Sequence, residues 1–180
     1  MVVETGNGAP TANRLAAVLV RHAGEAWERF TTYVDALPDD LWTGPIDTAG
    51  WTVKDHVAHV SAWDDSLVRL LTNGTPRPKS LRVSAAAWTG GYGPANEEIR
   101  QHTRHDSIQI VRIARNRTWA EVQMLLAHFS DHDLQQPATR FGLEGDRGSL
   151  FDKLADDLGV HYDQHLCWIR AIVESGSERD

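Results

Sequence analysis

Apolar residues recur at steps of three and four along four long stretches of the chain, and this spacing is typical of a helix that packs one face against a core. The stretches are residues 11–37, 52–72, 107–132 and 149–174. Residues 96–104 predict a short helix that leads into the third. Thr52 with Asp55 and Ser149 with Asp152 have the spacing of capping motifs that start a helix. The pattern predicts an all-α protein, a four-helix bundle.

Residues 73–95, between the second and third long helices, have no regular period and contain several glycines and prolines. A connection of this length in a compact domain is usually functional or disordered. Trp88 and Tyr92 lie within it, so the segment could close over a pocket or plug the open end of the bundle, and the sequence leaves both open. Residues 1–10 are interpreted as a disordered N-terminal arm, and residues 11–175 are expected to form a single domain with this one long crossover.

The fourth helix has two histidines in the middle of its predicted inward seam. The seam positions are Phe151, Leu154, Leu158, His161, His165, Trp168 and Ile172. Side chains four residues apart on a helix project side by side, about 5–6 Å apart at Cβ. Two neutral imidazoles at that spacing suit a divalent cation. The alternative is that each histidine finds a hydrogen-bond partner in the core, because an unpaired buried polar group costs about 1–3 kcal/mol.

A third ligand has two candidates on the second helix, His56 and His59. The apolar stripe of that helix passes close to His56, so periodicity favours His56 as the more buried of the two. The edge position of His59 suits a ligand that reaches toward a neighbouring helix. His128 and His132 are also four residues apart, but they lie off the stripe of the third helix at its C-terminal end. We interpret that pair as solvated and structural.

Composition and charge limit the classes of partner. The 180 residues are 41% apolar and 24% charged, as in an ordinary soluble globular protein, and no stretch resembles a signal peptide or reaches transmembrane length. The formal net charge of −7 argues against a nucleic-acid partner. The single cysteine, Cys167, excludes an internal disulfide and fits a reducing cytoplasm, and we expect it to be buried. The protein is therefore expected in the cytoplasm, away from the membrane, with a small-molecule partner; a homodimer is left open.

Two segments resemble signatures of the DinB/YfiT-like superfamily. Residues 50–60, Gly-Trp-Thr-Val-Lys-Asp-His-Val-Ala-His-Val, with residues 41–42 before them, resemble the first, and residues 161–170, His-x-x-x-His-Leu-x-Trp-Ile-Arg, resemble the second. The resemblance extends over nearly the whole chain and includes Asn96 at the entry to the third helix. Members of that superfamily are four-helix bundles with one divalent metal. They include the N-terminal domains of mycothiol-dependent maleylpyruvate isomerases and the bacillithiol transferases.

The resemblance implies that His59, His161 and His165 hold the metal and act in catalysis through it. At the position of His56 the family usually has an apolar core residue. We favour a core role for His56. The alternatives are that His56 bonds to a metal ligand or that it acts as a proton shuttle. Core packing alone would also explain the tryptophans near the ligands, which lie on the inward stripes. The substrate-pocket candidates, chosen for nearness to the ligands or for their place in the crossover, are His56, Trp63, Trp88, Tyr92 and Trp168.

Three histidines with an open fourth position are typical of a catalytic metal site. Imidazole ligands suit zinc, nickel, copper or iron, of which we expect zinc or nickel. The resemblance implies a divalent-metal-dependent enzyme that acts on a small electrophilic metabolite, by thiol S-transfer with mycothiol as co-substrate or by thiol-assisted isomerisation. The alternatives are a metal-dependent hydrolase or ring-opening enzyme of the self-resistance type, and a non-catalytic metal-binding bundle that sequesters a small molecule.

Overall fold

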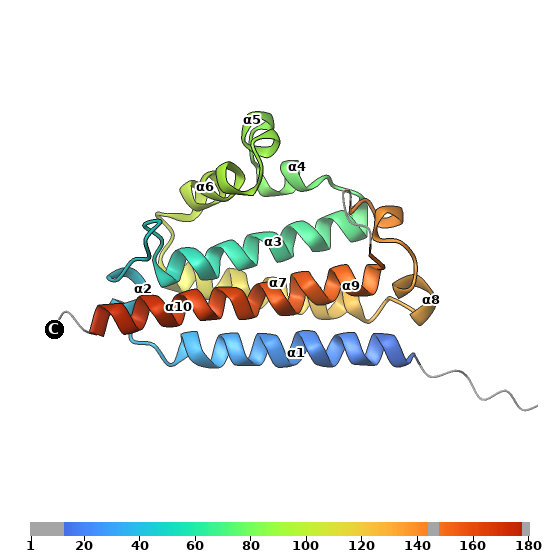
Figure 1. The fold of residues 1–180 in the computed structure, drawn as a ribbon, viewed down its shortest axis with the longest axis horizontal. Coiled ribbons are helices and arrows are strands. Elements are labelled where there is room, and N and C mark those ends of the chain that lie inside the picture. The colour runs from blue at the N-terminus through green and yellow to red at the C-terminus, as the bar shows by residue number, and fades with distance from the viewer. Residues whose placement is uncertain (1–12, 144–147, 178–180) are drawn as a thin grey trace, which may run out of the picture.

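Four long helices form a bundle in the computed structural model, which describes residues 13–143 and 148–177 (Figure 1). They are α1 (Arg14–Asp35), α3 (Val53–Asn73), α7 (Ile108–Leu126) and a fourth that runs through α9 (Leu150–Ala155), η2 (Asp156–Val160) and α10 (His161–Ser177). Helix α3 packs against α7 and α10, and α1 packs against α9, η2 and α10. Every regular element within the described residues is helical, which confirms the predicted all-α bundle.

The predicted capping motifs start two of these helices. The Thr52 side chain accepts a hydrogen bond from the backbone N–H of Asp55, and the Asp55 carboxylate accepts one from the backbone N–H of Thr52. Ser149 and Asp152 make the same reciprocal pair at the start of α9. Each pair satisfies backbone donors that a helix N-terminus otherwise leaves without a partner. The residues that carry the histidines are thus held in helices whose starts are fixed by sequence.

Short helices interrupt the connections that periodicity left without structure. They are α2 (Asp39–Thr43) and the 3-10 helix η1 (Ala138–Phe141). The third helix was predicted to extend to residue 132, which is too long. It ends at Leu126, and a capping box between Ser130 and Asp133 starts a separate short helix, α8 (Asp131–Leu134). The first helix begins at Arg14, and the predicted arm of residues 1–10 lies outside the described residues.

Residues 73–95 fold as a packed crossover along the side of α3 (Figure 1). The crossover contains α4 (Arg77–Leu81) and α5 (Ala85–Thr89) and leads into α6 (Tyr92–Thr103), which begins earlier than the helix predicted from residue 96. A small core of its own holds it together, made of Leu81, Val83, Ala95 and Ile99 with Ala62, Trp63 and Trp88 against them. Because α4 and α6 both pack on α3, the crossover flanks the bundle and does not plug its open end.

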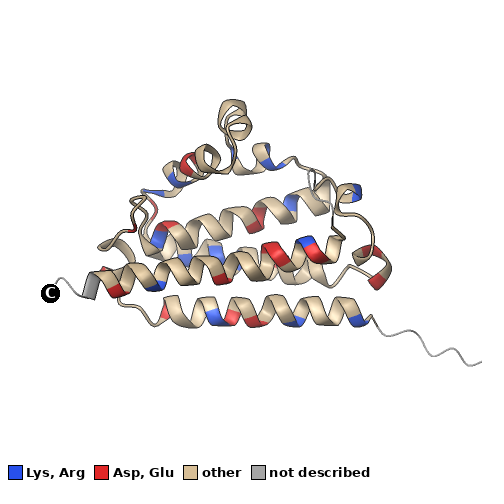
Figure 2. Cartoon of the chain, in the orientation of Figure 1, with Lys and Arg blue, Asp and Glu red and all other residues tan. Residues whose placement is uncertain are grey.

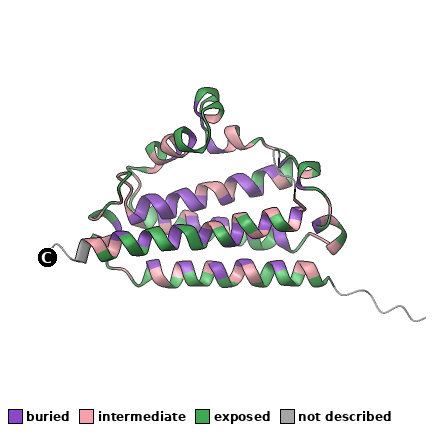
Figure 3. Ribbon diagram, viewed as in Figure 1, coloured by how far each residue is buried: buried purple, intermediate pink, exposed green. Residues whose placement is uncertain are grey.

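Buried residues gather on the facing sides of the long helices (Figure 3), and residues of both charges are interspersed along the chain (Figure 2). Ion pairs join neighbouring helices. Arg29 on α1 contacts Asp163 on α10 at 2.8 Å, and Arg115 on α7 contacts Asp35 on α1 at 2.9 Å. Among the described helices, none combines the length and the apolar character needed to cross a membrane.

The fourth helix contains a π-helical turn, η2, directly before the histidine pair. The backbone N–H of His161 donates to the carbonyl of Asp156, which lies one residue further back than in an α-helix. Such a turn accommodates one additional residue and moves the buried stripe to the next position along the sequence. Leu158 and Tyr162 are both fully buried, although the pattern predicted His161 at the position that Tyr162 occupies.

The predicted inward seam is therefore wrong at two positions. Ile169 is fully buried in place of Trp168, which is 49% exposed, and His161 is half-buried at the edge of the stripe. His165 keeps its predicted burial. Cys167 is exposed, because it lies about 200° around the helix from His165, and the expectation that this thiol is buried is wrong.

Candidate metal centre

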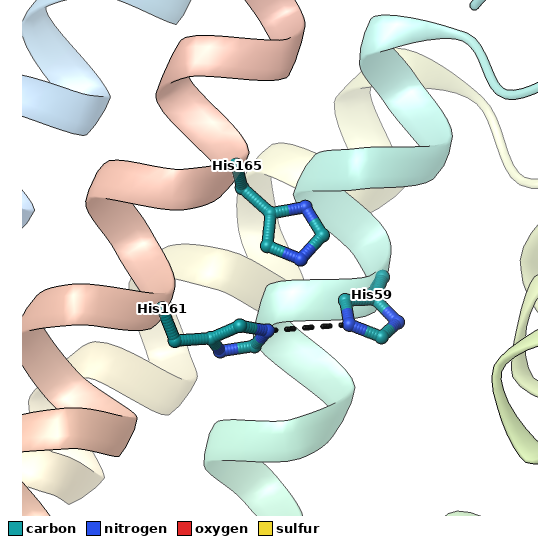
Figure 4. Close-up of side chains that lie close together, drawn as sticks. All are labelled: His59, His161 and His165. Carbon is teal, nitrogen blue, oxygen red and sulfur yellow. Dashed lines mark hydrogen bonds between the residues drawn. The ribbon is translucent and has the colours of Figure 1, made fainter. Parts of the chain in front are cut away.

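Three histidines from two helices meet on one side of the bundle (Figure 4). His59 comes from α3, and His161 and His165 come from α10. One ring nitrogen of each lies within 4.8 Å of those of the other two, and the Nε2 atoms of His59 and His161 are 3.3 Å apart. The structure thus brings together the three residues that the family resemblance implied, and their role as ligands stays a prediction.

The π-turn η2, which directly precedes His161, is in close contact with α1. Gly159 in that turn packs against His22 of α1, and a Cβ atom at residue 159 would overlap the His22 ring. The His22 Nε2–H donates to the carbonyl of Ala155 at 3.3 Å, which is one of the carbonyls at the junction between α9 and the π-turn. The local geometry ahead of His161 is therefore fitted to α1.

Burial keeps the three imidazoles neutral. His59 and His165 are each only 3% exposed, and burial lowers the pKa of both well below the ordinary value; the neighbouring histidines lower it further. Burial also lowers the pKa of His161, against an opposing effect of Asp157 and Asp156. A neutral imidazole has an unprotonated nitrogen, which is the form that binds a metal ion.

The donor set fits a divalent metal ion. Two nitrogens bound at about 2.0–2.1 Å in a tetrahedral site lie about 3.3–3.4 Å apart, and the Nε2 atoms of His59 and His161 have that separation. The Nδ1 atom of His59 is buried and has no hydrogen-bond partner among the described residues, so hydrogen bonds in the core satisfy this ring only in part. Three imidazoles could hold zinc, nickel, copper or iron with a further position for another ligand.

The three histidines open into a pocket of about 1700 Å³. All the pocket candidates line it, together with an aromatic residue that the sequence did not single out, Trp51. Trp63 is one of the lining residues, and its ring lies 5.8 Å from that of Tyr92 and 6.3 Å from that of Trp88. The Trp63 indole N–H donates to the Asn96 side chain at 3.2 Å, which fixes the ring. The role of these residues in binding a substrate is still a prediction.

Charged groups in the pocket wall are paired with one another. Arg77 and Lys153 both contact Asp157, at 2.7 and 2.6 Å, and the Arg77 guanidinium lies over the Trp63 ring. Asp64 also lines the pocket; burial raises its pKa to about 8, and it accepts a hydrogen bond from the Tyr162 hydroxyl at 2.6 Å. Sequence reasoning did not single out this buried pair, because an aspartate in a polar stretch of a helix is ordinarily exposed.

His56 is buried to the same extent as His59, at 3% exposure each, so the prediction from periodicity that His56 is the more buried of the two is wrong. Its Nδ1 lies 2.9 Å from Nδ1 of His165, and its Nε2 lies 3.3 Å from the carboxylate of Asp47. His56 is therefore buried, as the favoured core role requires, and it also contacts a candidate ligand, which was one of the alternatives. Asp47, in the loop before α3, was not foreseen.

The second histidine pair, His128 and His132, lies outside the candidate metal centre. His128 follows the end of α7 and His132 lies in α8, and both are exposed. The His128 Nδ1–H donates to the carbonyl of Met124, and His132 neighbours Gln136. Neither belongs to a cluster of metal-binding atoms in the part of the chain that the structure describes. Their interpretation as solvated residues agrees with this placement.

A family model and two solved structures match this chain. A model of the DinB superfamily matches residues 8–166. A crystal structure of a protein from Streptococcus pneumoniae has a TM-score of 0.67 at 13% identity over 87% of this chain and 88% of that one. An uncharacterised protein from Escherichia coli has a TM-score of 0.64 at 13% identity over 90% and 94%. These two likenesses show the fold alone, and the comparison with curated proteins finds no match. Because the family model covers most of the chain, the protein belongs to the DinB superfamily.

Proposed function

We propose that the protein is a divalent-metal-dependent enzyme that transfers a thiol to a small electrophilic metabolite or isomerises that metabolite with the help of a thiol. The observation that carries the proposal is the meeting of three neutral histidines at the wall of a large aromatic pocket. Three protein ligands leave a coordination position open. A bound zinc or nickel ion would supply Lewis acidity, which lowers the pKa of a thiol that enters this position.

The size of the pocket supports a reaction with two substrates. Its volume of about 1700 Å³ exceeds the roughly 300–1,000 Å³ of pockets that hold one drug-sized ligand. There is space for a low-molecular-weight thiol such as mycothiol beside the electrophile. A hydrolase acting on one small metabolite would need a smaller pocket.

The walls favour an electrophile with a planar, largely apolar part. Among the described residues, five aromatic side chains besides the histidines line the pocket, so its wall offers flat apolar surfaces to a planar group. The two wall cations, Arg77 and Lys153, share Asp157 as a partner, and Lys153 also lies 3.9 Å from Asp156, so two carboxylates balance the two cations. Asn96 holds Trp63 in place through the indole N–H. These residues bind and orient the substrate, and the histidines hold the metal.

An activity screen of the metal-loaded protein tests the proposal. Epoxide, halide and maleyl electrophiles are each offered with mycothiol, bacillithiol, glutathione or no thiol. We expect turnover that requires a thiol and is lost in His59→Ala, while His128→Ala, which changes an exposed histidine, keeps it. Turnover without a thiol would identify a hydrolase, and protection that is only stoichiometric would identify a sequestering protein. Either result would overturn the proposed reaction.

A further inference from the structure

A series of hydrogen-bonded side chains leads away from the candidate metal centre. Nδ1 of His165 faces Nδ1 of His56 at 2.9 Å, and Nε2 of His56 faces Oδ2 of Asp47 at 3.3 Å. Both imidazoles are 3% exposed. The rings of Trp51 and Trp168 flank His56, with centroids 5.3 and 5.9 Å away, and the Asp47 side chain at the end of the series is 25% exposed.

One arrangement of protons satisfies every contact in this series. His56 occupies Nδ1 of His165, so Nε2 is the nitrogen with which His165 can bind a metal ion. A neutral imidazole carries one donor and one acceptor. His165 then carries its proton on Nδ1 and donates to Nδ1 of His56. His56 in turn carries its proton on Nε2 and donates to Asp47.

The far end of the series is anchored by its own loop. Oδ1 of Asp47 accepts hydrogen bonds from the backbone N–H groups of Ala49 and Trp51 at 2.8 and 2.9 Å, which leaves Oδ2 for His56. The backbone N–H of Asp47 donates to the carbonyl of Trp51 at 2.9 Å, so the turn is closed in both directions. The carboxylate is therefore placed before any metal binds.

We propose that His56 and Asp47 are positioning residues for His165: they fix the ring orientation and the tautomer that present Nε2 to the metal, and they raise the basicity of that nitrogen. Metal-binding histidines commonly donate their second N–H directly to a carboxylate, and such partners contribute to metal affinity. In this protein an additional imidazole stands between the ligand and the carboxylate. The inference rests on the metal centre of the proposed function.

Zinc affinity, measured by competition with a chromophoric chelator, tests the role of His56. His56→Leu fills a similar volume but offers no acceptor to His165, and we expect the dissociation constant for zinc to rise about 10–100-fold. In His56→Asn the amide oxygen can take the place of Nδ1, so the dissociation constant should stay within about threefold of wild type. Asp47→Asn is expected to weaken binding by less than His56→Leu does. His128→Leu is the control, since that histidine is exposed.

The outcomes separate the two proposals. A wild-type protein that binds no zinc would overturn the metal centre itself. Zinc binding by wild type together with unchanged affinity in His56→Leu would overturn the positioning role alone. If His56→Leu does not fold, nitrogen-15 NMR of the zinc-loaded wild type decides: we expect protons on Nδ1 of His165 and Nε2 of His56. A proton on Nδ1 of His56, or none on Nδ1 of His165, would refute the series.

Discussion

His161 and His165 each present one nitrogen to the candidate metal centre, so the loss of either leaves two protein ligands, too few for tight binding. His161→Ala and His165→Ala are each expected to lose most of the roughly one divalent ion per chain that a three-histidine site holds. Elemental analysis of the purified proteins measures this. His128→Ala and His132→Ala are matched controls, which should keep the metal and change stability by less than about 1 kcal/mol. Full metal content in both α10 variants would contradict the assignment.

Asp64 makes the stability of the fold depend on pH. Burial raises the pKa of this carboxyl to about 8, whereas in an unfolded chain an aspartate has a pKa of about 3.9. Between these values the folded protein holds a proton that the unfolded chain releases. This contribution to the free energy of unfolding is therefore complete at low pH and is lost as the pH rises toward 8.

The variant Asp64→Asn isolates that contribution, because the amide still accepts from the Tyr162 hydroxyl and cannot ionise. We expect the urea-unfolding free energy of wild type to fall more steeply than that of Asp64→Asn between about pH 7 and 8, where an unperturbed histidine is already mostly neutral. Parallel curves for the two proteins would show that Asp64 is ionised in the fold.

His161 and His165 could be found from the sequence, because two histidines on an otherwise apolar stripe are unusual. Asp47 could not, because it precedes α3 in a loop and only the turn closed by Trp51 brings it to His56. Asp64 gives no sequence signal either. It follows Trp63 and precedes another aspartate, a context in which a solvated carboxylate is the ordinary expectation. The periodicity of one helix gives no information about hydrogen-bond partners that lie outside that helix.

The π-turn η2 depends on the absence of a side chain at residue 159. Gly159→Ala would drive a methyl group into His22, and overpacking of this kind costs about 1–3 kcal/mol. We expect lower stability in chemical denaturation and weaker metal binding, because His161 directly follows the turn. The double variant His22→Ala/Gly159→Ala should recover part of the loss, since the overlap is gone.

Gly24→Ala on α1 is the matched control for that prediction. A Cβ at residue 24 meets no atom within 4 Å, and alanine in a helix interior is about 0.5–1 kcal/mol more stable than glycine. The control should therefore gain stability where Gly159→Ala loses it. Equal effects at both positions would mean that the fit between His22 and Gly159 carries no energy.

Capping boxes and apolar spacing predict where α3 and α9 start, as Thr52 and Ser149 show. Apolar spacing predicted the wrong buried positions at His161 and Trp168, because it assumes the repeat of a regular α-helix, whereas the π-turn adds one residue. It failed again in the crossover, whose short helices are held by contacts with Trp63 and with one another and have no long period of their own. Tertiary contacts decided both cases.

At the scale of the whole molecule, the candidate centre joins α3 to α10, and a ligand that binds only the folded state must stabilise it. Zinc or nickel at about 100 times its dissociation constant is expected to raise the free energy of unfolding by about 2.7 kcal/mol. Thermal melts with added metal, and again after a chelator, measure the effect. The stabilisation should be absent in His59→Ala and present in His128→Ala. A melting temperature indifferent to metal would count against the centre.

The tryptophans around the pocket give the protein an optical reporter of its own. The Trp51 ring lies 5.3 Å from that of His59, and the Trp168 ring lies 4.8 Å from that of His165. Indole emission is quenched by paramagnetic ions at such short range, so copper or nickel entering the site should dim the fluorescence, whereas zinc, with a filled d shell, should mainly shift it. Arrival of the ion, and its displacement by a competing one, can therefore be timed in unlabelled protein.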